Sequence, residues 1–89
     1  MKSIYKYDLD YHGKSKIEIQ GTGKVLYTAV QDGKLRVWVE VDTNDYIKQT
    51  LNFYVFHTGE EIPKCLENAK YIGTFVVEAT YYVGHVYQY

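Results

Sequence analysis

Apolar and polar residues alternate with a period of two along most of the chain. In the first run, Tyr5, Tyr7 and Leu9 fall on one side and Lys6 on the other, and the alternation extends over residues 4–11. Successive side chains of a β-strand point to opposite faces of the sheet, so this period is typical of a half-buried strand. The pattern therefore predicts a strand over these residues.

The same period recurs in later segments of the chain. The most regular of them places Leu35, Val37 and Val39 on a single face. Asp32-Gly33 lies between this segment and the preceding one, and Asp-Gly in such a setting is a strong signal of a tight β-hairpin. Further strands are expected over residues 16–20, 24–31, 35–41, 51–56, 71–78 and 81–88.

Residues 58–69 form the longest segment without this period. Pro63 interrupts strand pairing there, and because proline suits the start of a helix we expect a short helical turn running to about Asn68. Many short strands and no long helix predict an all-β fold. We expect a single antiparallel β-sandwich or small barrel of about six to seven strands, with residues 1–89 forming one domain.

Tyrosine is unusually frequent, with 11 examples among 89 residues. The segment 71–89 contains five of them and only one formal charge, that of Glu78. An exposed strand of this composition would aggregate unless it were paired or covered. Two explanations stay open: a central hairpin buried on both faces, or an interface between copies of the chain, since interface cores lack charge and are rich in tyrosine. We expect a homo-oligomer that forms through this C-terminal tyrosine-rich hairpin.

Charge and composition narrow the class of protein. Ten basic and eleven acidic residues give a net charge of −1, which argues against a binder of duplex nucleic acid. The single cysteine, Cys65, excludes an internal disulfide and fits a reducing compartment. No apolar run approaches the ~18–20 residues of a membrane span, and no signal peptide is recognisable. We therefore expect a cytoplasmic protein that contacts no membrane.

The sequence contains no recognisable catalytic or metal-binding motif. Both serines lack the flanking glycines of a nucleophile elbow, and Cys65 lies near His57 without a third group to orient the pair. His12, His57 and His85 lie far apart and lack the short spacings typical of zinc ligands, and His85 is expected to be hydrogen-bonded within a sheet. We predict a protein that is not an enzyme and uses no metal and no cofactor.

Two groups of residues are candidates for binding a ligand. Arg36 and Trp38 share the polar side of one expected strand, and Tyr54 and Phe56 share a side of a strand that could be its neighbour. Aromatic faces beside a guanidinium can stack a base and hold a phosphate. The alternative is that these rings form a second core layer of a sandwich.

The second candidate is the loop that runs from His57 to Pro63. Polar groups and a glycine at the end of a strand are common in binding sites, although a solvated turn explains them equally well. In the binding hypothesis, aromatic rings stack a base, Arg36 pairs with a phosphate, and the loop supplies hydrogen bonds. The expected ligand-binding residues are Arg36, Trp38, Tyr54, His57, Thr58 and Tyr87.

Several short motifs occur in a recognisable order. They are Ile4-Tyr5-Lys6-Tyr7, Asp32-Gly33 with the Trp-bearing strand after it, Val41-Asp42, Thr58-Gly59 with Ile62-Pro63, Tyr71-Ile72-Gly73-Thr74 and Val83-Gly84-His85-Val86-Tyr87. In this order and spacing the chain resembles, over nearly its whole length, a family of short, mostly phage- and prophage-encoded proteins described only as a domain of unknown function.

The chain departs from that family in one motif. The family often has Gly-Thr-Gly-His before its Ile-Pro or Val-Pro, whereas this chain has His57 at the first glycine position and Glu60 at the histidine position. A role of the family histidine therefore does not transfer to this chain, although His57 is a candidate to replace it from a neighbouring position.

The resemblance implies a phage accessory protein made in the cytoplasm of the host bacterium. By analogy, small β-rich phage proteins often counter host defence. We therefore expect a non-enzymatic, counter-defence protein that binds and sequesters a small nucleotide-like signal in an aromatic-lined pocket. Two alternatives are an inhibitor that covers a host defence protein with strand edges and tyrosines, and a minor virion or assembly protein.

Overall fold

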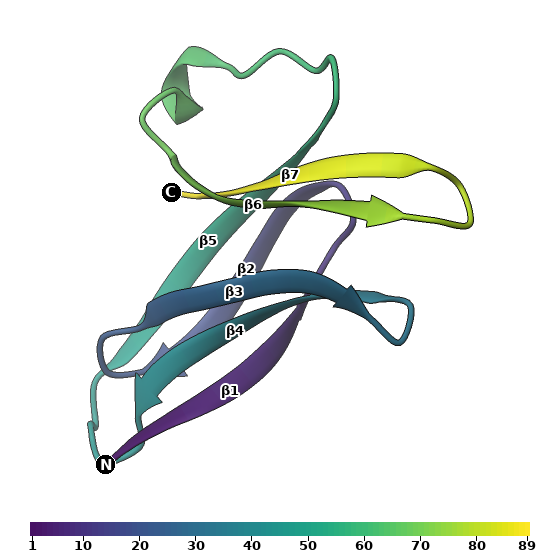
Figure 1. Ribbon diagram of the computed structural model, residues 1–89. Coiled ribbons are helices and arrows are strands. Elements are labelled where there is room, and N and C mark those ends of the chain that lie inside the picture. Colours follow the sequence, from purple (N-terminus) through teal and green to yellow (C-terminus); the bar gives the residue numbers. More distant parts are fainter.

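The alternating segments form seven strands in two antiparallel sheets (Figure 1). The computed structural model describes residues 1–89. Its elements are β1 (Lys2–Leu9), β2 (Gly13–Gln20), β3 (Lys24–Gln31), β4 (Lys34–Asp42), β5 (Lys48–His57), the 3-10 helix η1 (Lys64–Leu66), β6 (Lys70–Val77) and β7 (Tyr82–Gln88). One sheet has the order β1-β4-β3 and the other the order β2-β5-β7-β6. The predicted all-β class is confirmed.

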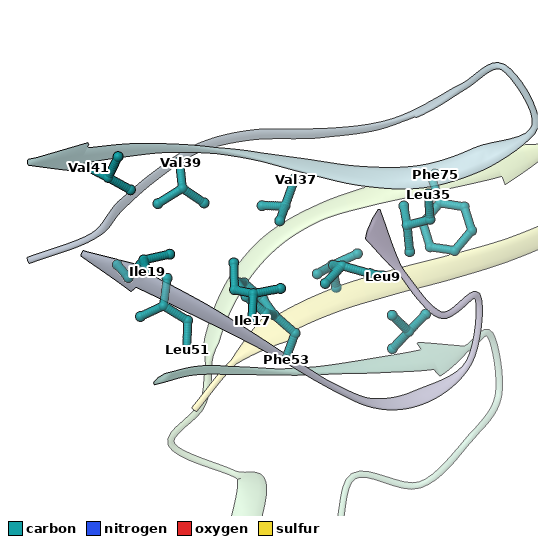
Figure 2. Packing of buried hydrophobic residues seen from close by; sticks show 12 residues of the cluster. Leu9, Ile17, Ile19, Leu35, Val37, Val39, Val41, Leu51, Phe53 and Phe75 are labelled. Carbon is teal, nitrogen blue, oxygen red and sulfur yellow. The ribbon is translucent and has the colours of Figure 1, made fainter. Parts of the chain in front are cut away.

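The hydrophobic core lies between the two sheets. Val37 and Val39 of β4 and Phe53 of β5 are 0% exposed, as the alternation predicts. Figure 2 shows Val37 and Val39 pointing from one sheet toward Ile17 and Phe53 of the other. A sandwich requires this arrangement, because each sheet buries one face and leaves the other to solvent or to a covering segment. The outward-facing residues are therefore the ones available for binding.

The predicted hairpin turn forms between β3 and β4. Asp32 and Gly33 have φ angles of 54° and 74°. A two-residue turn that matches the twist of its strands requires positive φ at both positions, and Asp-Gly tolerates this better than most pairs. This turn fixes the register in which Gln31 faces Lys34.

The sandwich is open on both sides rather than closed as a barrel. β3 and β6 come close along one side, but no ladder joins them. On the other side, β1 and β2 are connected by the turn that contains Tyr11, which sequence analysis had placed in the first strand. The sheets therefore have free edges at β1 and β3 and at β2 and β6.

The C-terminal hairpin of β6 and β7 is not buried on both faces. β7 lies between β5 and β6, but β6 is an edge strand, and its Tyr71 and Val76 are 53% and 50% exposed. A central hairpin buried on both faces is therefore wrong. Phe75 and Val86 bury only the inner face of this hairpin in the core.

The segment between β5 and β6 contains the expected helical turn. η1 is shorter than predicted, and Pro63 precedes it as its N-cap rather than occupying its first position. Figure 1 shows this segment above β7, on the side of the four-stranded sheet away from the other sheet. No helix of the structure has both the length and the apolar character that a membrane crossing requires.

Candidate functional site

Two histidines and a glutamate come together at one end of the four-stranded sheet. In the antiparallel pairing of β2 with β5, Gly13 faces Val55. His12 precedes β2 and His57 ends β5, so this register brings both imidazoles to the same end of the sheet. The ring centroids of His12 and His57 lie 5.5 Å apart. Two histidines that lie far apart in the sequence therefore lie side by side in the fold.

Glu60 joins the two histidines into one cluster. Its Oε1 lies 2.9 Å from Nε2 of His12 and 3.7 Å from Nε2 of His57, and it accepts a hydrogen bond of 3.1 Å from the backbone N–H of His57. Partial burial on its own would raise the pKa of Glu60. The hydrogen bonds from His12 and His57 and the attraction of both imidazoles outweigh that effect and hold the pKa below its usual value.

His85 lies apart from this cluster and is held within the sheet. Its Nε2 is 2.9 Å from Oγ1 of Thr58 and its Nδ1 is 2.9 Å from Oγ1 of Thr74. Both ring nitrogens therefore have partners, as the sequence pattern predicted. His85 is a structural residue that also fixes the hydroxyl of Thr58.

Two shallow hollows flank the cluster of His12, His57 and Glu60. The larger hollow has a volume of about 500 Å³ and is lined by Tyr11, His12, Val77, Thr80 and Tyr82. The smaller one has a volume of about 380 Å³ and is lined by His57, Thr58, Tyr81, Tyr82 and Val83. Tyr82 therefore lines both hollows, and each hollow contains one histidine of the cluster.

Tyr82 is fixed in its position between the hollows. Its hydroxyl donates a hydrogen bond of 2.9 Å to the carbonyl oxygen of Tyr11. Burial raises the pKa of Tyr82, and the nearby negative charge of Glu60 raises it further. The phenol therefore stays neutral at physiological pH and presents a rigid ring to both hollows.

Tyr81 has a strained backbone conformation at the mouth of the smaller hollow. Its φ angle is 54°, and its side chain is 86% exposed. A bulky residue rarely has positive φ, and such strain persists mainly where turns or functional sites require it. Tyr81 ends the turn between β6 and β7, and its exposed ring stands beside His57 and Thr58.

A row of aromatic rings crosses the outer face of the same sheet. Tyr54 and Phe56 have ring centroids 4.4 Å apart, and Tyr87 lies 5.5 Å from both Phe56 and Tyr71. Phe56 is only 3% exposed although it lies outside the core cluster, and Leu66 is the one buried residue of the covering segment. This row is therefore mainly packing beneath the segment that carries η1.

Tyr54 nevertheless reaches the cluster. Its ring stands edge-on to that of His12 at a centroid distance of 6.4 Å. The structure thus brings the predicted Tyr54, His57 and Thr58 to one end of the sheet. Tyr87 shares their face but lies farther along the row, beside Phe56.

Arg36 and Trp38 lie on the outer face of the other sheet. β4 and β5 belong to different sheets, so the pairing that would place Trp38 across from Tyr54 does not exist. The guanidinium of Arg36 donates to Gln31 at 2.9 Å, and its Nε lies 3.3 Å from a carboxylate oxygen of Asp8. Trp38 packs against the ring of Tyr27 at 5.9 Å. Arg36 and Trp38 therefore cannot share a small ligand with Tyr54, nor do they form a second core layer.

The model of one protein family, Domain of unknown function (DUF7352), matches residues 1–89. The chain belongs to this family. The match confirms that the chain belongs to a family described only as a domain of unknown function, and it covers the whole chain. No curated protein and no solved structure matches the chain.

His57 and Glu60 of this DUF7352 chain meet in the structure. His57 and Glu60 are joined by two hydrogen bonds, because the N–H of Glu60 also donates to the carbonyl oxygen of His57 at 3.1 Å. Both residues are thus part of one turn, and they supply two of the three residues of the cluster.

Proposed function

We propose that this DUF7352 domain is a non-catalytic binding protein that takes a small nucleotide-like ligand in the two hollows around Tyr82. The observation that carries the proposal is the convergence of Tyr81, Tyr82, His57 and Thr58 on one hollow, with the ring of Tyr81 exposed. Tyrosine rings and hydroxyl or imidazole groups are the partners that a planar base with polar edges requires.

The size of the hollows fits such a ligand. The larger hollow, at about 500 Å³, falls within the roughly 300–1,000 Å³ typical of sites for small molecules. Tyr11 and Tyr82 give it aromatic walls, and His12 lies at its border with the cluster. A ligand with a ring in one hollow and a second polar group in the other would contact both sides of Tyr82.

Each polar group has a distinct role in this proposal. The imidazole of His57 lines the smaller hollow and suits a polar atom on the edge of a base. The hydroxyl of Thr58, already positioned by His85, contacts a second polar atom of the ligand. Tyr81 covers the face of the base, since its ring is free of other contacts over most of its surface.

The biological role proposed here follows the resemblance to phage and prophage proteins. A chain of phage origin, made in the host cytoplasm, would sequester a nucleotide signal of host defence and so counter that defence. The domain would act as a homo-oligomer, since β6 exposes Tyr71 and Val76, whose side chains would pack against a second copy. A monomer in light scattering would remove the oligomer from this proposal.

The first experiment is a thermal-shift screen of the folded protein against cyclic dinucleotides, cyclic trinucleotides and ADP-ribose derivatives. A ligand that binds only the folded state raises the melting temperature, and the rise grows with the logarithm of its concentration relative to its Kd. We expect a shift with one class of the panel. The proposal fails if every compound leaves the melting temperature of the well-folded protein unchanged.

A second candidate function is inhibition of a host defence protein. It is favoured by the exposed apolar side chains on and beside the three-stranded sheet, where Ile4 and Tyr27 are 60% and 63% exposed. Ile4 belongs to β1, which is an edge strand of this sheet and can pair with a strand of a partner protein. A pull-down from host lysate tests this function. Recovery of one host protein in stoichiometric amount by the parent chain, and not by Tyr27→Ala, would favour inhibition over ligand sequestration.

A further inference from the structure

The geometry points to a binding site for a divalent transition-metal ion, of the Zn²⁺ class, formed by His12, His57 and Glu60. Two imidazole nitrogens and a carboxylate oxygen lie within 4.8 Å of one another. Zinc bonds of about 2.0–2.2 Å in a tetrahedral shell place ligand atoms about 3.3 Å apart. The observed separations of 2.9 Å and 3.7 Å from Glu60 Oε1 to the two Nε2 atoms lie on either side of that value.

His57 is oriented as a metal ligand. Its Nδ1 lies 3.0 Å from the carbonyl oxygen of Thr58, and only a protonated Nδ1 can donate to that oxygen. In a neutral imidazole the other nitrogen, Nε2, then carries the free lone pair. Histidines that bind metals usually donate their second nitrogen to a carbonyl or carboxylate in this way. The lone pair of His57 is thus available on the side of Glu60.

The two other ligands are also held in place by the backbone. Glu60 and His57 are joined by reciprocal hydrogen bonds across a tight turn whose Gly59 has φ of 92°. His12 is fixed by the pairing of β2 with β5 and by its edge-on contact with Tyr54. A metal ion would take the place of the proton that His12 shares with Glu60, and the fold would need only small side-chain movements.

The donor set selects the kind of ion. Two imidazoles and one carboxylate favour Zn²⁺, Co²⁺, Ni²⁺ or Cu²⁺ over Mg²⁺ and Ca²⁺, which prefer shells made only of oxygen. Three protein ligands leave one position of a tetrahedral shell open. Because His12 lines one hollow and His57 the other, the ion would lie between the two hollows. The metal site stands on its own geometry and does not depend on the identity of the proposed ligand.

The test is a calorimetric titration of the untagged full chain with Zn²⁺, in which no nucleotide is present. We expect one ion per chain, and His12→Ala and Glu60→Gln are each expected to weaken Zn²⁺ binding about tenfold or more. Co²⁺ is expected to give a visible spectrum of tetrahedral type that is lost in the same variants. Mg²⁺ is expected to compete poorly.

Matched controls separate this site from adventitious binding. Glu61→Gln changes the carboxylate next to Glu60 in the chain. Cys65→Ser removes the exposed thiol. Both variants are expected to bind Zn²⁺ as the parent chain does. The inference is overturned if the parent chain does not bind Zn²⁺, if folded His12→Ala and His57→Ala bind it unchanged, or if Cys65→Ser abolishes binding.

Discussion

Nε2 of His12 lies 2.9 Å from Oε1 of Glu60, although 48 positions separate the two residues in the chain. The contact joins the turn between β1 and β2 to the turn that follows β5. It exists only because β2 pairs with β5, so it reports directly on the register of that edge of the sheet. The candidate metal site and both hollows are built around this contact.

We expect His12→Ala to cost little stability in the absence of metal. The side chain of His12 is 51% exposed, and an ion pair at such a position contributes below about 1 kcal/mol. Urea denaturation in the presence of a chelator measures the change. A loss of several kcal/mol would show that the cluster is needed for folding, and would contradict the view that it is available for binding.

We expect Tyr81→Gly to keep or raise the free energy of unfolding. Glycine tolerates the observed φ of 54° without a clash, so the substitution relieves about 1–2 kcal/mol of backbone strain. The greater conformational freedom of glycine in the unfolded chain costs about 0.5–1 kcal/mol of this gain. Tyr81→Ala is the matched control, because it removes the ring and keeps the Cβ that causes the strain. Destabilisation by both variants would mean that the ring stabilises the fold, and destabilisation by Tyr81→Gly alone would contradict the backbone strain.

We expect Gly84→Ala to destabilise the sandwich by about 1–3 kcal/mol, as overpacking of a core does. A Cβ at this position would come nearer than 3.0 Å to two ring carbons of Phe75 and to 3.1 Å from Val55. Thermal or urea denaturation measures the loss. The double variant with Phe75→Leu should recover part of it, since the smaller side chain frees the space; additive losses would contradict this explanation.

Asp42 makes stability depend on pH in the acid range. The pKa of Asp42 is lowered from 3.8 by the backbone N–H of Asn44 and by the amino group of Met1, whose hydrogen bonds to Oδ1 both measure 3.1 Å. Because the folded-state pKa is the lower one, this contribution is present above the pKa of the unfolded chain and is lost as pH falls through the folded value.

We expect Asp42→Asn to be less stable than the parent chain near pH 7. The difference should shrink as the pH is lowered below 3.8 toward the folded-state pKa. Urea denaturation of both chains across this range measures it. A difference that stays constant with pH would show that the carboxylate charge of Asp42 does not contribute.

The strands and the face of each residue could be predicted from the sequence because they depend on local alternation. Val37 and Val39 are buried and Trp38 points outward, as the period of two requires. Asp32-Gly33 was equally informative, because a two-residue turn has few solutions. The order of strands in each sheet depends on contacts between distant segments. Tyr54 and Trp38 were therefore grouped although they lie on different sheets.

The candidate site was predicted only in part for the same reason. His57 and Thr58 could be predicted as binding residues because they form a polar loop at a strand end. His12 and Glu60 become neighbours of His57 only through the pairing of β2 with β5 and a tight turn, neither of which leaves a spacing motif. The sequence pair Tyr81-Tyr82 after β6 indicates an aromatic binding surface, but its composition is equally typical of an interface between subunits.

The most direct test of ligand binding around Tyr82 is a calorimetric titration of the best compound from the thermal-shift panel. We expect one binding site per chain. Tyr81→Gly should bind the compound at least about tenfold more weakly, since stacking on one ring contributes about 1–3 kcal/mol. Tyr46→Gly should bind it unchanged, because the side chain of Tyr46 is 99% exposed elsewhere on the protein. No binding by the folded parent chain, or equal binding by Tyr81→Gly, would contradict the proposed function.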